Sequence, residues 1–394
     1  MVSQRSRMDK GHNKISEKAA LKRKKIKLFL WIASLACLGI QPFFALNGLD
    51  NTFPWGTCFI AAQSFAAAGD GAFITAFLFY IFRVDNLKTL IPSCLLASLL
   101  SNLFASLFML LNSGQPLRLC NMLLTPAWGR SLIPDSMLTV AFFSMLICFV
   151  ILCVQFVPTV LTHKAFEKNG KAHAAAHYMK KLIWIPAAAF FFFAAIAHAS
   201  FGGGIWESLH TKAFWHREYH SLFIAGIATA AAGGALLVLC LTSFHSEKYP
   251  AKAISSILAI AKHAFIIYCL IRIADVSLMT TELLKERELF AIWGGRFGLW
   301  MLVLEFCLAI ASIFLLSQKT HPCIRIGAIC GISAIIAANI STVLQGFSMP
   351  EFPWEDFAVY LQAPAEILAI PAAIILMILL YNWAAGRFKI FPDV

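Results

Sequence analysis

The chain has 394 residues, of which 60% are hydrophobic and 13% are charged, and its formal net charge is +12. A water-soluble protein of this length needs a much more polar surface, so the composition excludes that class. The positive charge could suggest nucleic-acid binding, but Lys and Arg are spread over a tail and alternate loops, which argues against a single basic binding face.

The apolar residues fall into long runs, and a run of about 20 residues matches the hydrocarbon core of a bilayer. Ten such runs predict an all-α, polytopic membrane protein with about ten transmembrane helices. In chain order, the predicted spans are 27–47, 55–82, 88–112, 134–160, 182–200, 219–243, 252–275, 296–316, 322–343 and 360–384.

The spans suggest a symmetrical arrangement inside a transmembrane domain at 27–384. Spans 2–5, at 55–200, and spans 6–9, at 219–343, are expected to form two four-helix bundles, with one further helix flanking each side. No sequence repeat between the two halves supports this symmetry, so the expectation is architectural.

Charge asymmetry orients the spans. With the N-terminus inside, the tail at 1–26, the tail at 385–394 and alternate loops hold most of the 32 Lys and Arg residues. This positive-inside pattern predicts a multi-pass protein of the bacterial inner membrane with both termini in the cytoplasm. The basic runs at 22–25 and 163–181 are interpreted as topology signals that face anionic membrane lipid, with a binding role as the alternative. Span 1 is expected to remain as an anchor, because its basic region is too long for a signal peptide and no cleavage motif follows.

Cysteine and histidine spacing argues against a redox centre in this chain. The 11 cysteines contain no C-x-x-C or ferredoxin-like pattern, which disfavours an iron–sulfur cluster. Of the histidines, only His198 and His263 lie within spans, near opposite surfaces, while His216 and His220 are in or at the edge of an outer loop, so a membrane haem held between facing helices is disfavoured. No metal site is predicted.

Several loops on the predicted outer side are long, which makes that face the better candidate for docking a partner, with ordinary solvated loops as the alternative. These loops carry tryptophans that suggest an interfacial aromatic belt, namely Trp128, Trp206, Trp215, Trp293 and Trp354.

Two acids are predicted near the middle of the bilayer, where an ionisable side chain costs several kcal/mol and suggests function. Glu305 is the only charge in the run from Trp300 to Leu316 and has no helix end to cap, so a proton-exchanging role is favoured. Asp70 lies in Ala68-Gly69-Asp70-Gly71, beside small residues that allow helices to approach closely.

Other ionisable residues lie toward the outer side. Asp135 follows Pro134 at the start of span 4, where capping the helix is a structural alternative to chemistry. Arg272 and Asp275 are three residues apart and share a helix face, so a structural salt bridge is favoured for them. Glu366 lies in the outer third of span 10.

A quinone headgroup fits these constraints, because it needs an apolar slot, hydrogen bonds to its carbonyl oxygens and a nearby group that exchanges protons. Asp135 and His198, at outer depth in spans 4 and 5, could exchange those protons if the two helices are neighbours.

From about residue 50 to 384 the chain resembles the NrfD/PsrC family, and in particular its HybB-like branch. Five stretches carry the resemblance: Trp55-Gly56 followed by Ala66–Ala72, the loop Asn112–Arg118, His198-Ala199-Ser200 with Gly203 and Phe214-Trp215, Leu304-Glu305-Phe306, and Tyr360 with Glu366. Their order and spacing are more specific than any one of them.

The resemblance implies a cofactor-free membrane subunit that exchanges electrons between menaquinone and an iron–sulfur, ferredoxin-like partner. It also implies a catalytic or multihaem subunit on the outer face, as in hydrogenase or molybdopterin-reductase complexes, and a quinone slot toward the outer surface. By this interpretation Asp135 and His198 exchange the quinone's protons, while Arg118, Trp215 and Tyr360 line the slot or its rim. Asp70, Glu305 and Glu366 could form a proton route toward the centre.

The sequence departs from the family pattern in places. Asn112 and Gln115 stand where the family has Asp and Arg, Ala337 stands for an Arg and leaves Asn339, and Asp70 stands where a small residue is usual. Two alternatives therefore stay open: a proton-coupled transporter with a helix broken near Asp70, and a membrane anchor without quinone activity.

Overall fold

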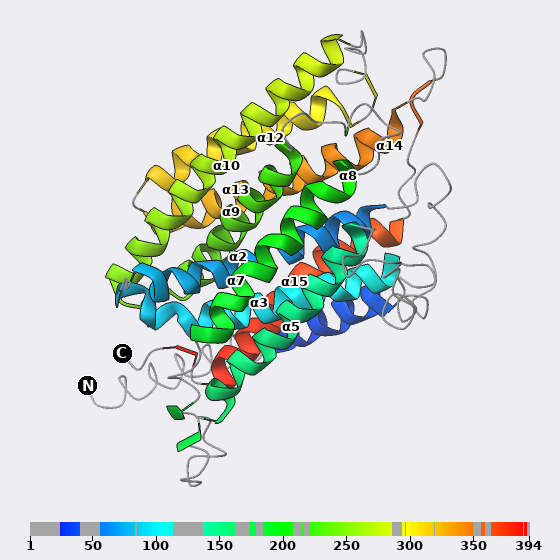
Figure 1. Cartoon of the computed structure of the whole chain (residues 1–394). Coiled ribbons are helices and arrows are strands. Elements are labelled where there is room, and N and C mark those ends of the chain that lie inside the picture. The colour runs from blue at the N-terminus through cyan, green and yellow to red at the C-terminus, as the bar shows by residue number, and fades with distance from the viewer. Residues whose placement is uncertain are drawn as a thin grey trace, which may run out of the picture.

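The computed structural model describes most of the chain as helices. The described residues are 24–39, 56–82, 85–112, 137–161, 174–175, 177–178, 184–207, 215, 221–285, 294–295, 297–318, 320–349, 356–358, 364–388 and 390–391. Every regular element among them is helical. Figure 1 shows the long helices lying side by side and running roughly in one direction.

Seven of the described helices are long and apolar enough to cross a membrane. The remaining predicted spans coincide with helix 24–39, α2 and α5. The all-α, polytopic membrane class predicted from composition is therefore confirmed.

The helices of the first half pack against one another. This set, here the first helix set, comprises α2 (Thr57–Phe82), α3 (Ile91–Asn112), α5 (Met137–Leu161) and α7 (Trp184–Ala199), with the short η2 (Asp85–Leu90) before α3. Helix α7 continues through a π-helical segment, η4 (Ser200–Gly204), into α8 (Ile205–Glu207).

The second helix set repeats this pattern. It comprises α9 (Ser221–Phe244), α10 (Ala251–Lys285), α12 (Leu299–Ser317) and α13 (His321–Ile340), with η7 (Ser246–Lys248) between α9 and α10. Helix α13 also continues through a π-helical segment, η8 (Ser341–Gln345), into α14 (Gly346–Ser348). The last helix, α15 (Pro364–Arg387), packs beside α3 and α2 of the first set.

Glycines bring the two sets into backbone contact where α2 crosses α9. A Cβ atom at Gly71 would overlap the carbonyl of Ala230, and a Cβ atom at Gly234 would overlap the backbone of Gly71. In lipid, helices associate through close packing rather than through a hydrophobic driving force, and small residues permit that packing. Gly71 and Gly234 therefore determine how closely the two helix sets approach.

Helix α10 is the longest, with 35 residues, which corresponds to about 52 Å at 1.5 Å per residue. The hydrocarbon core is about 30 Å thick, so α10 extends beyond it. We call the end at which α9 ends and α10 begins the basic end (lower left in Figure 1), because Lys248 and Arg325 lie there. The positive-inside pattern predicts that the basic end faces the cytoplasm.

Candidate functional site

A buried hydrogen-bonded trio joins three helices of the first set. The Oδ2 atom of Asp70, on α2, lies 2.7 Å from Nε2 of His198, on α7. The Oδ1 atom of Asp70 accepts a hydrogen bond of 2.8 Å from Nδ2 of Asn102, on α3. All three side chains are buried. Both oxygens of the carboxylate are thus paired, as a buried acid requires.

Gly69 and Gly71, the glycines on either side of Asp70, serve different helix contacts. A Cβ atom at Gly69 would lie 2.7 Å from Nδ2 of Asn102, so the glycine leaves room for the amide that binds Asp70. Gly71 faces α9 instead, at the crossing described above. The expectation that small residues around Asp70 allow close helix approach is confirmed.

His198 lies deeper than its position at the end of a predicted span suggested. Span 5 was expected to end at residue 200, but α7 continues through η4 and α8 as far as Glu207. The π segment begins two residues after His198, and insertions of this kind often mark functional sites in helices. A Cβ atom at Gly226 would lie 2.6 Å from the carbonyl oxygen of His198, so α9 packs directly against this turn.

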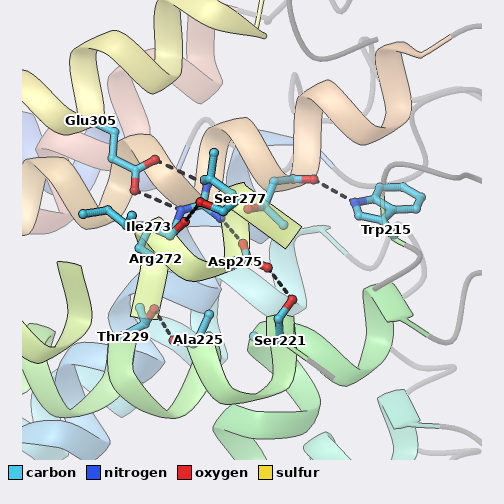
Figure 2. A network of polar contacts seen from close by, with 12 residues as sticks. Trp215, Ser221, Ala225, Thr229, Arg272, Ile273, Asp275, Ser277 and Glu305 are labelled. Atoms are coloured by element: carbon cyan, nitrogen blue, oxygen red, sulfur yellow. Dashed lines mark hydrogen bonds and ion pairs between the residues drawn. The ribbon is translucent and has the colours of Figure 1, made fainter. Parts of the chain in front are cut away.

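A second buried polar cluster lies in the second helix set, and Figure 2 shows it from close by. The guanidinium of Arg272 donates to Oδ2 of Asp275 at 2.6 Å and to both carboxylate oxygens of Glu305, at 3.0 and 3.3 Å. Ser221 donates to Oδ1 of Asp275 at 2.6 Å, and the hydroxyl of Tyr268 lies 3.4 Å from Oε1 of Glu305. The cluster therefore joins α9, α10 and α12.

This cluster tests two predictions made from the sequence. The predicted pairing of Arg272 with Asp275 is confirmed. The expectation that Glu305 is an isolated carboxylate is wrong, because Arg272 reaches it from the neighbouring helix. The charge count still leaves an imbalance, since one guanidinium faces two carboxylates. With both acids ionised the cluster carries a surplus negative charge, which one proton would neutralise.

A small cavity lies between the trio and the cluster. It is lined by His198 from the first set, by Arg272 and Tyr268 from the second, and by the polar side chains Gln63, Thr229 and Asn339. Its volume of about 20 Å³ fits a single water molecule. Oε1 of Gln63 is buried and has no hydrogen-bond partner among the described residues. The cavity thus offers polar groups from both helix sets to one shared water position.

Trp206 and Trp215 do not belong to an interfacial belt, and that expectation is wrong for these two residues. Both are fully buried, with ring centroids 5.2 Å apart, and the Trp215 ring also packs edge-on against Phe347. Nε1 of Trp215 donates to the carbonyl of Thr342, inside the π segment η8, at 2.8 Å. A π segment interrupts the regular backbone hydrogen bonds of a helix, and the indole N–H of Trp215 supplies a donor to one carbonyl in this segment.

Several predicted site residues cannot be placed. Arg118, Asp135 and Tyr360 lie outside the described residues. Glu366 lies in the first turn of α15, and its side chain is also outside them. The suggested neighbourhood of Asp135 and His198 is therefore untested, whereas Nε2 of His198 is already bonded to Asp70.

Sequence reasoning missed three members of the site: Gln63, Asn102 and Tyr268. Gln63 stands seven residues before Asp70, and Tyr268 stands four before Arg272, so each shares a helix face with a buried charge. A search for polar residues at such spacings from a buried charge would have identified both. Asn102 comes from another helix, and its position carried no comparable signal.

Within the described part of the chain, no group of three or more His, Cys, Asp or Glu side chains could hold a metal ion.

Comparison with known proteins supplies the wider context. The family model described as polysulphide reductase, NrfD, matches residues 45–351. A curated relative from Nitratidesulfovibrio vulgaris, the integral membrane subunit of menaquinone reductase, is 25% identical over 370 residues, which cover 88% of this chain and 86% of the relative.

Proposed function

The chain belongs to the polysulphide reductase NrfD family, and we propose that it is the quinone-reactive membrane subunit of a respiratory oxidoreductase complex. Menaquinone is the proposed substrate, which is supported by the name of the relative from Nitratidesulfovibrio vulgaris. Electrons would pass between menaquinone and an iron–sulfur partner docked on the outer face. The chain itself would carry no haem and no iron–sulfur cluster.

The observation that carries this proposal is the buried pair of Asp70 and His198 beside the water-sized cavity. Oxidation of menaquinol releases a pair of electrons and a pair of protons. The electrons leave to the partner, so the membrane subunit must accept and deliver the protons. A buried carboxylate bonded to an imidazole holds one proton as a neutral pair, and when the pair releases that proton the hydrogen bond from Asn102 remains to stabilise the Asp70 carboxylate.

The quinone slot is proposed to lie on the outer side of this pair. Asp135 would exchange a proton with the headgroup together with His198, and Arg118 and Tyr360 would line the slot or its rim. Trp215 is proposed to support the wall of the slot rather than to bind the quinone itself, because its ring packs against Phe347 and its N–H donates to Thr342.

From His198 we propose a proton route across the cavity to the Arg272 cluster. A water in the cavity would connect the first helix set with Tyr268 and Glu305. The surplus carboxylate of the cluster would hold the arriving proton. Glu366 is proposed as a further member of the route.

The transporter alternative loses its structural basis. A helix broken near Asp70 was one feature that favoured it, but α2 runs without interruption from Thr57 to Phe82. The glycines on either side of Asp70 serve packing against α3 and α9 instead.

The test is electron transfer by the intact complex purified with its partner subunits. With a water-soluble menaquinol analogue as donor, His198→Gln should reduce turnover about 100-fold or more, the range in which general acid–base groups contribute. Asp70→Asn and Asp135→Asn should each reduce it as well. The matched control is His263→Gln, because His263 is exposed on α10 and its Nδ1 lies 2.7 Å from the carbonyl oxygen of Ala259 in its own helix.

Each variant must still be purified with its partners, which separates lost chemistry from lost assembly. Wild-type turnover in an assembled His198→Gln complex would refute the role of the Asp70–His198 pair. Absence of any quinone-dependent activity in the wild-type complex would refute the proposed function as a whole.

A further inference from the structure

A long groove runs between the two helix sets and adjoins the small central cavity at Ala67, which lines both. Its volume is about 970 Å³, and its walls come from α2, α9, α13 and α15. The walls are mostly aliphatic and aromatic, and Ile329, Ile378 and Phe244 in them are 47%, 40% and 53% exposed. In a bilayer such open apolar surface faces lipid rather than water. The groove is therefore suited to hydrocarbon chains.

One end of the groove is strongly basic. His245 and Lys248 line it where α9 ends, Lys27 lines the groove from the start of helix 24–39, which the positive-inside pattern predicts on the same side, and none of the described residues that line the groove is an acid. We call these three residues the basic mouth. A basic pocket between transmembrane helices at the cytoplasmic surface is a known setting for anionic lipid headgroups.

Two side chains of the basic mouth, Lys248 and His245, pack against neighbours. Nζ of Lys248 lies 4.0 Å from the centre of the Phe391 ring. Nδ1 of His245 lies 3.1 Å from the carbonyl oxygen of Leu241, and its ring centroid lies 5.1 Å from that of Phe391. Tyr249 also packs on Phe391, and burial raises the pKa of its hydroxyl, so it adds no negative charge to the mouth. Lys248 and His245 thus have defined neighbours, and the two lysines make the mouth a cationic site.

The α9 wall of the groove is about as long as one leaflet of a bilayer is thick, while the α2 wall continues toward the opposite side as far as Thr57. From His245 to Gly233, halfway along α9, the rise is about 18 Å at 1.5 Å per residue. Half of the hydrocarbon core is about 15 Å. Toward the opposite end the lining residues, such as Thr57 and Ser64, are uncharged. The charge distribution therefore favours a ligand whose headgroup lies at the basic end.

We propose that this groove binds a phospholipid with an anionic headgroup from the leaflet at the basic end. The phosphate would lie at Lys27, His245 and Lys248, and the acyl chains would lie between α9, α13 and α15. Because this lipid would fill the seam between the two helix sets, its binding should stabilise the folded protein. The proposal does not depend on the quinone reaction.

The test compares lipids of different charge on the purified, delipidated complex. Micelles that contain phosphatidylglycerol should raise the thermal unfolding temperature more than micelles that contain phosphatidylcholine. Native mass spectrometry should show the anionic lipid retained on this subunit. Equal binding of the two lipids, or retention of quinone alone, would overturn the proposal.

Charge-matched variants locate the site. Lys27→Gln combined with Lys248→Gln should weaken phosphatidylglycerol binding about 25-fold, since each lysine near the surface contributes about fivefold. The control combines Lys24→Gln with Lys252→Gln, which removes the same charge from exposed lysines on the same helix and at the adjacent start of α10. Equal weakening by the two pairs would show only general attraction to anionic lipid and would overturn the proposed site.

A third variant tests the walls. Ser333→Trp adds a large side chain inside the groove, where Ser333 is only partly buried, and it leaves the basic mouth intact. It should abolish the stabilisation by phosphatidylglycerol. Full stabilisation in this variant would show that the acyl chains do not enter the groove.

Discussion

The two buried acids near the middle of the bundle have different environments and therefore suit different roles. Asp70 shares one proton position with His198 and takes a further hydrogen bond from Asn102. Glu305 competes with Asp275 for the single guanidinium of Arg272. A proton on the first pair lies in the hydrogen bond between Asp70 and His198. A proton on the second cluster neutralises the one carboxylate charge that exceeds the positive charge of Arg272. We infer that the pair exchanges protons and that the cluster stores them.

A substitution at Glu305 tests this distinction. Glu305→Gln keeps the shape of the side chain and leaves Arg272 paired with Asp275, so the surplus negative charge disappears. In liposomes that contain the assembled complex, quinol-driven proton uptake should fall to the level of protein-free liposomes. Glu247→Gln is the control, because Glu247 is an exposed acid in η7. Normal uptake with Glu305→Gln would return Glu305 to a structural role.

At the scale of the elements, the last helix of each set is interrupted in the same way. The π segments η4 and η8 follow α7 and α13, directly after His198 and Asn339, which both line the central cavity. Close packing accompanies them: Gly202 in η4 packs against Gly226 of α9, and Gly346, directly after η8, packs against the Trp215 ring. The interruptions allow polar side chains to point into the seam while the helices continue across the membrane.

Two adjacent glycines on α9 test the importance of the helix crossing. Gly234→Ala would place a Cβ atom on the backbone of Gly71, so the helices must separate, at a cost of about 3 kcal/mol or more. Gly233→Ala would meet nothing nearer than 3.6 Å and serves as the control. Thermal unfolding in detergent should show a clear loss of stability only for Gly234→Ala. Similar unfolding temperatures for the two variants would contradict the proposed backbone contact.

For the whole molecule, the orientation of the bundle in the membrane is predicted from the distribution of positive charge. The long helix α10 has described, exposed residues at both ends, Lys252 and Thr281. The positive-inside pattern predicts that Lys252 faces the cytoplasm and Thr281 the outer side. The same orientation places the proposed lipid in the cytoplasmic leaflet and the proposed iron–sulfur partner on the opposite face.

Single-cysteine variants at the two ends of α10, made in a cysteine-free background, test this orientation. A maleimide that cannot cross membranes should label Thr281→Cys in intact cells whose outer membrane has been permeabilised. The same reagent should label Lys252→Cys only after the inner membrane is broken. The opposite pattern would invert the topology and would move the partner-docking face to the other side.

The sequence by itself determined the all-α membrane class and the approximate bounds of the long helices that the structure describes, because hydrophobic runs of bilayer length depend on local composition alone. It also determined the pairing of Arg272 with Asp275, because the two share one helix face. Only the tertiary structure decided that His198 binds Asp70, that Arg272 also binds Glu305 and that Trp215 is buried. Those contacts join residues from different helices, and their geometry depends on how closely glycines allow the helices to approach and where the π segments rotate the chain. The spacing of side chains along one helix predicts neither the closeness of helix approach nor the rotation of the chain at a π segment.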